Sequence, residues 1–526
     1  MCINSHEISE LRNRLTREFR FSLISLYNFN HLGIRALHSL LKSKGIHVDL
    51  IFFKNMLFND AKRPTGEEIN KLTKLVKEKE PHLVGISVSC SAFYGLAKDI
   101  TLSIKQKIES PVIWGGVHPT IDPDQCTNHA DMVFIGEGEF GMLDLITKMS
   151  QNQGYSHIPG LWTKMNDGRL IKNAPLPLKN FLDLIPPNDY EDERKYYIEN
   201  ENLKDGDPYQ KDNELYTILT GRGCPFDCTY CINHLFKEIY PEKGVPIRRR
   251  SVSHVINELD HAKKKFPNLK RITIFDDVFV LDKKWAKEFC DEYKEKINLP
   301  FSCLFHPSTI KEDIISILKE GGLDYIDMGI ESGSERIRRE IFERKDSNQV
   351  IKNAVDIMHK YKIRPYLDFI LDNPFETIED KQQSLDLLLS FPRPFMFYFY
   401  SLIYFPKTKM TQLALEKEII TEDDVEDKKG KVFDQFQVTF NYKRNKEELF
   451  WICLFSLSGK RFIPKFLIRG LSKVRLLSAN PALLVVLATV SNYIRVIGIG
   501  LERLFSGQMT YTMFKRYFKI AFTLNR

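Results

Sequence analysis

The stretch Thr-Gly-Arg-Gly-Cys-Pro-Phe-Asp-Cys-Thr-Tyr-Cys, residues 220–231, carries three cysteines with the spacing C-x3-C-x2-C. They are Cys224, Cys228 and Cys231. Three closely spaced thiolates suit a four-iron, four-sulfur cluster in which one iron stays open for a small molecule. Zinc usually takes four protein ligands, often as two C-x2-C pairs, and no convincing fourth ligand is visible. The stretch therefore predicts an iron–sulfur cluster, with a zinc knuckle or an accidental cysteine cluster as the alternatives.

The cysteines follow a short strand pattern. Residues 216–220 are β-branched and aromatic, and Gly221 and Gly223 then break the pattern, which puts the cysteines on a loop after a strand. In an α/β barrel, chemistry is carried by loops at the C-terminal ends of the strands. Strand patterns then alternate with helix patterns, at residues 216–220, 271–275, 301–305, 325–330, 365–371 and 396–404. Six strands are fewer than the eight of a closed barrel, so we expect a partial (β/α)6 barrel.

Residues 20–148 show an earlier β-α alternation, which predicts a doubly wound, Rossmann-like parallel sheet. Ligands of such sheets bind beyond the C-terminal ends of the strands. Three loops are expected there, and their glycines would let the backbone approach a large flat ligand. The candidate ligand-binding residues in these loops are Ser87, Ser89, Gly115, Gly116, His118, Gly136, Glu137 and Gly138.

Together these motifs resemble the cobalamin-dependent radical S-adenosylmethionine (SAM) enzymes. The cysteine spacing matches the signature of that superfamily, and residues 329–334, Gly-Ile-Glu-Ser-Gly-Ser, match it at the end of the fourth barrel strand. The resemblance covers about residues 20–440. It implies that the open iron holds SAM and cleaves it reductively to a 5′-deoxyadenosyl radical, which abstracts hydrogen from an unactivated carbon.

The resemblance also implies individual roles in SAM binding. Tyr230 would lie against the adenine, with plain packing as the alternative. Asp276 and Asp277 would accept hydrogen bonds from the amine or ribose, unless one of them caps a helix. Glu331, with Ser332 beside it, would bind the ribose or amine. Further candidates at strand ends are His306, Asp368 and Asp372, while Arg248 and Arg250 are expected in structural salt bridges.

By the same resemblance, the N-terminal sheet would bind cobalamin. The motif D-x-H-x-x-G of the cobalamin mutases is absent, so no histidine ligand to cobalt is implied, and His31 is expected at a helix start or in a loop. A vestigial domain with an empty site is the alternative. The motifs at residues 371–377 and 405–408 depart from the family where the substrate would lie, so the resemblance does not identify the substrate.

Four regions are expected along the chain: a cobalamin-binding domain at 1–150, a linker with a hairpin at 151–210, the radical SAM barrel at 211–445 and a basic helical extension at 446–526. Within the linker, residues 191–207 are expected at the surface. Of the net charge of +7, the segment from Leu449 to the C-terminus carries +11 and the remainder carries −4. Arg461, Lys465, Arg469 and Lys473 recur every fourth residue and predict one basic stripe.

That extension would either lie on an anionic membrane surface or cap the barrel. Its apolar run at 483–490 is expected to be too short to span a bilayer, which takes about 20 residues. The chain start lacks a signal-peptide pattern, so we expect a reducing cytoplasm and cysteines that serve as thiols or ligands.

The function expected is C-methylation by a radical SAM enzyme with a four-iron, four-sulfur cluster, SAM and cobalamin. The substrate would be a small molecule or a lipid, and an electron donor such as flavodoxin or ferredoxin would act as partner. The alternatives are a radical cyclase or rearrangement enzyme, an RNA-modifying enzyme and a non-catalytic cobalamin or redox sensor. Nucleic acid is not an expected partner because no RNA-binding module is recognisable.

Overall fold

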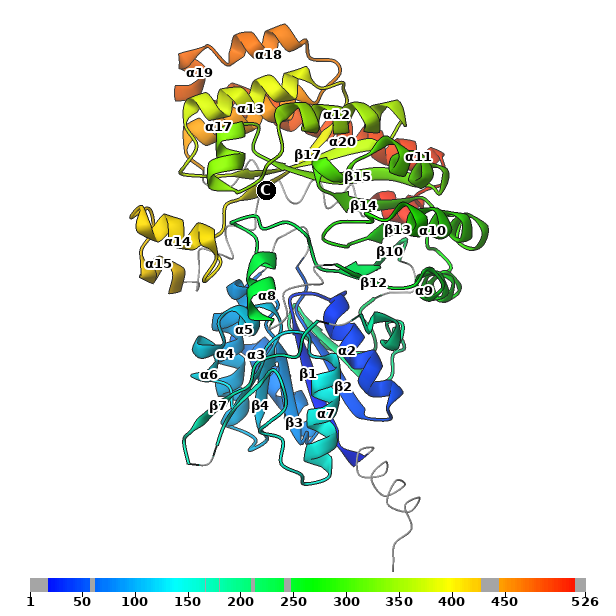
Figure 1. Cartoon of the computed structure of the whole chain (residues 1–526), viewed down its shortest axis with the longest axis vertical. Coiled ribbons are helices and arrows are strands. Elements are labelled where there is room, and N and C mark those ends of the chain that lie inside the picture. The colour runs from blue at the N-terminus through cyan, green and yellow to red at the C-terminus, as the bar shows by residue number, and fades with distance from the viewer. Residues whose placement is uncertain are drawn as a thin grey trace, which may run out of the picture. The chain divides into compact units, whose positions relative to one another are not determined.

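The computed structural model describes residues 18–56, 62–165, 167–178, 180–209, 213–240, 247–426 and 444–515. The chain divides into two compact units (Figure 1). The first unit comprises Met1–Gln210, Cys231–Arg248 and Tyr404–Asp434. The second comprises Lys211–Tyr230, Arg249–Ile403 and Gln435–Arg526. These boundaries differ from the expected ones, because the chain passes from one unit to the other inside the cysteine stretch.

The first unit is built on five parallel strands in the order β5-β4-β3-β1-β2. The strands are β1 (Arg20–Leu26), β2 (His47–Phe53), β3 (Leu83–Ser87), β4 (Val112–Gly115) and β5 (Met132–Phe134). The helices between them are α2 (Leu32–Ser43), α3 (Gly66–Glu78), α4 (Tyr94–Lys105), α5 (Val117–Ile121), α6 (Pro123–Thr127) and α7 (Glu139–Ser150). The doubly wound sheet is confirmed.

Local sequence signals set where the first helices begin. The side chain of His31 caps α2 by accepting a hydrogen bond from the Ile34 amide at 3.2 Å, which confirms it at a helix start. Thr65 and Glu68 form a reciprocal capping box at the start of α3. Such caps satisfy amides that the first helical turn leaves without a partner.

The expected linker supplies both edges of this sheet. Strands β6 (Leu161–Lys164) and β7 (Leu170–Lys172) form an antiparallel hairpin beside β5. The hairpin is confirmed, although Asn166 of its turn lies outside the described residues. On the other edge, β8 (Lys195–Glu199) runs parallel to β2 and pairs with β9 (Asn202–Asp205). The edges of a five-stranded sheet would otherwise leave backbone donors and acceptors unpaired.

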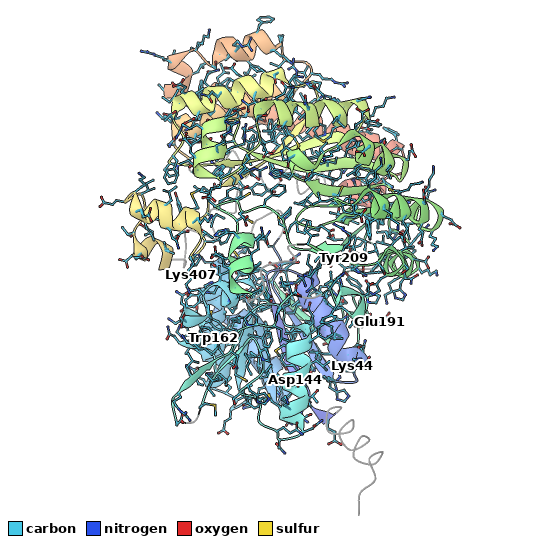
Figure 2. All side chains as sticks on the ribbon, in the orientation of Figure 1. Lys44, Asp144, Trp162, Glu191, Tyr209 and Lys407 are labelled. Atoms are coloured by element: carbon cyan, nitrogen blue, oxygen red, sulfur yellow. The ribbon has the colours of Figure 1, made fainter. Side chains whose placement is uncertain are left out.

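A buried ionic cluster fastens the β8 edge to α2. The Arg35 guanidinium donates to both carboxylate oxygens of Asp207, at 2.7 and 2.8 Å, and Lys195 lies 2.9 Å from the same carboxylate. Burial by itself would raise the pKa of Asp207, but Arg35 and Lys195 hold it below its ordinary value. Tyr209, labelled in Figure 2, packs on Tyr190 with ring centroids 4.9 Å apart, and Arg35 lies over the Tyr190 ring at 4.4 Å.

The second unit is a six-stranded parallel sheet whose strands follow one another in chain order. The strands are β10 (Leu215–Ile218), β13 (Arg271–Ile274), β14 (Phe301–Phe305), β15 (Leu323–Glu331), β16 (Arg364–Leu371) and β17 (Met396–Ser401). The crossover helices are α9 (Val252–Lys265), α10 (Lys283–Lys296), α11 (Glu312–Glu320), α12 (Asn348–Lys360) and α13 (Ile378–Ser390). The partial (β/α)6 barrel is confirmed.

Alternate residues of these strands are buried on one face of the sheet, for example Ile326, Met328 and Ile330 on β15. Short elements complete the described chain. They are η1 (Ser91–Phe93), η2 (Leu182–Leu184), β11 (Gly221–Arg222), α8 (Asn233–Ile239), β12 (Arg248–Arg249), η3 (Pro307–Thr309), η4 (Ile337–Ile341), α14 (Lys409–Glu416) and α15 (Glu422–Glu426).

The C-terminal extension is helical, as expected, but it is not one amphipathic helix. It consists of α17 (Lys446–Ser458), α18 (Lys465–Leu471), α19 (Arg475–Ala479) and α20 (Ala482–Phe505). Arg461 precedes α18 and Lys473 follows it, so the predicted basic stripe is wrong: the chain turns on either side of α18. Arg461 and Lys465 instead donate to the carbonyls of Arg393 and Phe391, each at 2.9 Å. Helix α17 is almost wholly buried and packs on α13 and α20.

The ionic cluster predicts that the expected linker is part of the folded first unit. Asp207→Ala should lower the free energy of unfolding by about 3–5 kcal/mol, because it leaves two buried cations short of their carboxylate. Asp205→Ala is the matched control, since Asp205 is an exposed residue of β9 and its loss should change stability by less than about 0.5 kcal/mol. Urea unfolding of both variants provides the measurement. Equal stability of the two would show that the cluster does not hold this edge.

Candidate cluster and SAM site

The cysteine loop begins just after β10, the first barrel strand, and its start is held by Asp276. The buried carboxylate of Asp276 accepts hydrogen bonds from the amides of Thr220, at 2.7 Å, and Gly221, at 3.2 Å. It also accepts from the Thr220 hydroxyl at 2.5 Å and from the Arg249 guanidinium at 3.2 Å. Burial raises the pKa of Asp276, and Arg249 opposes that shift.

Both oxygens of Asp276 are therefore used by the protein itself, in a role that positions the loop. Helix capping, the alternative considered for Asp276 or Asp277, falls instead to Asp282, which caps α10. The assignment of Asp276 and Asp277 to SAM stays a prediction. Arg249 was not among the candidates, and only its contact with Asp276 makes it part of the loop anchor.

Two further residues of the loop, Phe226 and Thr229, hold it within the second unit. The ring of Phe226, between the first two cysteines, stacks on His306 with centroids 3.7 Å apart. Thr229, between the second and third cysteines, donates through its hydroxyl to the Ile341 carbonyl at 2.6 Å and through its amide to Phe342 at 3.2 Å. His306 also lies 3.2 Å from Asp346, and burial lowers its pKa. His306 thus supports the loop from the end of β14.

Arg344 connects the loop to the predicted SAM-binding acid. Its guanidinium lies 3.1 Å from both the Tyr230 hydroxyl and the Glu331 carboxylate, and it donates to the Gly329 carbonyl at 2.7 Å. Glu331 ends β15 in the left-handed region, with φ of 69°, where the pairing register with β16 shifts. A residue other than glycine held in that conformation is typical of sites where function sets the backbone.

The structure therefore brings Tyr230 and Glu331 together through a residue that the sequence did not reveal. Arg344 lies 13 positions after Glu331 and in no strand or helix, so only the fold brings it to the site. Burial raises the pKa of Glu331, and Arg344 opposes the shift. Tyr230 packs edge-on against Phe342, with centroids 4.9 Å apart. Ser332 is buried and donates to Glu376 at 2.6 Å, so its hydroxyl joins the fourth and fifth strand-end loops.

The donor set of the cysteine loop fits an iron–sulfur cluster. Burial raises the pKa of the Cys228 thiol, while Arg344 and the Tyr230 hydroxyl favour its thiolate. Thiolates are the form in which cysteine binds iron. Within the ranges that the structure describes, no three His, Cys, Asp or Glu side chains are gathered in a geometry that would hold a metal ion. The fit therefore rests on the chemistry of the three thiols and on the anchoring of the loop.

Two acidic residues lie on the face of the sheet that the helices leave open. Asp327 on β15 is paired in register with Tyr366, and Asp368 on β16 is paired with Tyr398 on β17. Residues paired or two apart along parallel strands share a face, so all four side chains lie on one side, joined by Tyr400. One oxygen of each aspartate is buried and has no hydrogen-bond partner among the residues that the structure describes.

These carboxylates are poised to accept a proton or a hydrogen-bond donor. Burial raises the pKa of Asp327 to about 7, with Arg271 opposing the shift. Burial, with Glu331 and Asp327 nearby, raises the pKa of Asp368 well above its ordinary value. Unpaired buried carboxylates are costly, and such groups cluster at functional sites. Asp368 was expected on or after the fifth strand and lies inside it, whereas Asp327, inside the fourth strand, was missed. Asp372 is paired with Arg444 at 3.0 Å.

In the first unit, most of the predicted ligand-binding residues gather at the C-terminal edge of the sheet. Ser87, Ser89, Gly115, Gly116, Gly136, Glu137 and Gly138 are all exposed or half-buried there. His118 is different, because it is fully buried, bonded to the Ser91 hydroxyl at 3.0 Å and packed edge-on against Tyr94. Gly116 has a φ of 106°, and a β-carbon there would meet the Val88 carbonyl at 3.1 Å. Its glycine is thus required by the loop itself.

The segment after the third cysteine packs on these loops. Helix α8 contacts α5, and the Tyr240 hydroxyl accepts from the Glu137 amide at 2.9 Å. Arg248 forms two hydrogen bonds to the Glu137 carboxylate, at 2.8 and 2.6 Å, so the salt bridge expected for Arg248 is confirmed. Glu137 is therefore engaged by the protein. By contrast, a β-carbon at Gly115 would meet nothing closer than 3.9 Å, which leaves space for a ligand.

Comparison with known proteins identifies both domains. Residues 25–146 match the B12 binding domain, and residues 218–388 match the radical SAM superfamily. The chain therefore combines the two domains of the cobalamin-dependent radical SAM enzymes, a B12-binding domain and a radical SAM domain. The radical SAM domain implies a four-iron, four-sulfur cluster and SAM as cofactors, and the B12-binding domain implies cobalamin.

Among relatives, the uncharacterized methyltransferase PH0819 of Pyrococcus horikoshii is 30% identical over 322 residues, 60% of this chain and 65% of the relative. The anaerobic magnesium-protoporphyrin IX monomethyl ester cyclase of Rubrivivax gelatinosus is 23% identical over 367 residues, 68% of this chain and 61% of the relative. The chain thus matches less than two thirds of the length of either. The radical SAM methyltransferase TsrM of Kitasatospora setae shares the fold, with a TM-score of 0.57, 18% identity and 76% of each chain covered.

The buried Asp327 predicts a pH-dependent stability. Because the folded protein holds the Asp327 proton more tightly than the unfolded chain, stability should fall as the pH rises from about 4 to about 7. Asp327→Asn removes this titrating group. The free energy of unfolding of the variant should therefore rise, relative to that of the wild type, by up to about 1.4 kcal/mol per pH unit in that window. Asp291→Asn, an exposed site on α10, is the charge-matched control. Urea midpoints at several pH values test this, and a constant difference between Asp327→Asn and wild type would refute it.

Proposed function

We propose that this chain is an enzyme that methylates an unactivated carbon, with SAM, cobalamin and a four-iron, four-sulfur cluster as cofactors. The single observation that supports this proposal most is the combination, in one chain, of a B12-binding domain with a radical SAM barrel whose three cysteines follow the first strand. When bound, the cluster supplies the electron that cleaves SAM, and cobalamin supplies the methyl group.

In this proposal the residues of the second unit hold the cluster and SAM. Cys224, Cys228 and Cys231 bind three irons and leave the fourth for the amine and carboxylate of SAM. Glu331 accepts from the SAM ribose or amine, and Arg344 orients its carboxylate and opposes the rise in pKa that burial causes. Tyr230, within the cysteine loop and bonded to the same Arg344, packs against the adenine in this proposal.

In the first unit, the open strand-end loops would hold the corrin. Ser87, Ser89 and Gly115 are the partly exposed residues that would face it. Glu137 and the buried His118 are bonded to other residues of the protein, so in this proposal they support the loops and do not contact the corrin directly. An external electron donor such as a flavodoxin or ferredoxin is a further part of the proposal.

The acidic face of the barrel indicates the chemistry of the substrate. Asp327 and Asp368 each leave a buried oxygen to be satisfied, so the substrate should offer hydroxyl or ammonium donors. The tyrosines around them add flat apolar surface with polar tips. We therefore propose a small molecule, or the polar part of a lipid, that carries such donors near the carbon to be methylated.

Radical cyclisation is the second candidate, because one relative is a cyclase. Purified protein, reconstituted without oxygen with iron, sulfide and cobalamin, should be supplied with SAM and a reductant. Methylation yields 5′-deoxyadenosine and methionine from one SAM and S-adenosylhomocysteine from another, whereas cyclisation yields 5′-deoxyadenosine and methionine without S-adenosylhomocysteine. Mass spectrometry of the SAM products separates the two, and formation of neither product would contradict both.

Replacement of any one cluster cysteine should abolish SAM cleavage. Cys224→Ala, Cys228→Ala and Cys231→Ala should each lose the bound iron–sulfur cluster, because each thiolate holds one iron. Cys290→Ala, which removes a thiol from α10, should keep both the iron content and the cleavage. Iron and sulfide assays with 5′-deoxyadenosine quantification are the readouts. Full iron content in a cluster-cysteine variant would disprove the site.

A bulky residue at Gly115 should block cobalamin binding by filling the space beside the strand-end loops. Gly115→Leu should lower the corrin absorbance retained after gel filtration by about tenfold, while the domain stays folded, since a β-carbon there meets no close neighbour. Gly154→Leu is the control, because Gly154 also has open space and lies elsewhere. Unchanged retention in Gly115→Leu would place the cobalamin away from these loops.

A further inference from the structure

Helix α20 has the reverse of the polarity that a surface helix normally shows. Its polar residues face the rest of the second unit. Asn492 accepts hydrogen bonds from Ser456 and Lys460. Arg495 donates to the carbonyls of Phe395, at 2.5 Å, and Gly459, at 3.4 Å. Ser491 is buried among them. These bonds fix which side of α20 is turned toward the protein.

The opposite side of α20 is apolar and exposed. Its exposed apolar residues, here called the outer face, are Leu483, Val486, Leu487, Val490, Ile494, Leu501 and Phe505. Their spacing follows the helical repeat and places them along one side. Exposure of these side chains runs from 38% at Leu501 to 85% at Phe505. In a water-soluble surface helix such a stripe would face the core.

We propose that the outer face of α20 docks the second unit onto an anionic membrane surface, with the helix lying in the plane of the interface. This inference stands independently of the proposed function. By length and composition alone, α20 could also cross a membrane, so the expectation that this apolar run is too short was wrong. We favour the interface, because the bonds of Asn492 and Arg495 keep one whole side of the helix on the protein.

The charge around α20 selects the membrane over other occupants. Exposed Lys473 and Arg475 lie beside α18 and on α19, and α19 packs against α20. Arg469 on α18 is also exposed, but its guanidinium lies 3.7 Å from the Asp386 carboxylate. The segment from Leu449 to the C-terminus carries +11, with Glu502 as its single acid. A second copy of this chain would bring equal positive charge to the same surface and be repelled. Anionic lipid headgroups instead attract it, by about 1 kcal/mol for each lysine or arginine near the surface.

Exposed apolar side chains next to these basic residues extend the contact. Phe466 on α18 and Leu476 on α19 are each 77% exposed. Aromatic and aliphatic residues interspersed with basic ones are the composition of helices that lie at the lipid headgroup boundary. Glu502 does not oppose this arrangement, since it is paired with Arg364 at 2.7 Å on the barrel.

The full-length protein should be tested by flotation with vesicles of phosphatidylcholine alone and of phosphatidylcholine with phosphatidylglycerol. The wild type should float with the anionic vesicles at low salt and much less with the neutral ones. Val486→Gln, Val490→Gln and Ile494→Gln together should weaken partitioning by about tenfold or more, because three apolar contacts with lipid are lost. The exposed positions of these residues should leave the melting temperature unchanged.

A matched control replaces three exposed leucines of the first unit, Leu102, Leu176 and Leu203, by glutamine, and it should float like the wild type. Arg469→Gln, Lys473→Gln and Arg475→Gln together should remove most of the salt dependence. Release of bound protein by alkaline carbonate would support the interfacial position, whereas resistance would show a spanning helix and overturn it. Absence of flotation, with or without self-association of the protein through α20, would also overturn the proposal.

Discussion

The buried carboxylate of Asp276 is the interaction on which the arrangement of the cysteine loop depends. It lies at the end of the second barrel strand and binds the two amides at which the first strand ends and the loop begins. Six parallel strands bring their C-terminal ends to one edge of the sheet, so an acid on one strand can hold the loop of its neighbour. Arg249 compensates the charge that this burial leaves on Asp276.

The acids of the barrel divide into two groups by whether the protein satisfies them. Asp276 and Glu331 have arginine partners, and both hold the region of the cysteines in place. Asp327 and Asp368 lack such partners for one oxygen each, although they are on neighbouring strands of the same sheet. A protein that leaves two desolvated carboxylates side by side gives up stability at that point. The contrast separates the acids that position the cysteine loop from the two that we propose for substrate binding.

Helix α20 shows the same logic at the surface. Its polar side chains form hydrogen bonds to the rest of the second unit, and many of its apolar side chains are exposed to water, which is unfavourable for them. Exposure of this apolar surface costs free energy in water, and the arrangement becomes favourable once the apolar interior of a membrane covers the surface. Because the residues beside the helix are basic, an anionic lipid surface is the partner that we propose.

The sequence by itself determined the features that depend on local order. The strand and helix repeats, the caps at His31 and Thr65, and the cysteine spacing are all contained in short segments, so the two α/β domains and the cluster could be predicted. Tertiary structure alone decided which distant groups complete the site. Arg344 reaches Glu331 and Tyr230, β8 closes the edge beside β2, and α20 turns its polar side inward only because residues far apart in the chain meet. A buried charge is paired by residues that are distant in the sequence, and a local sequence pattern does not show which residues those are.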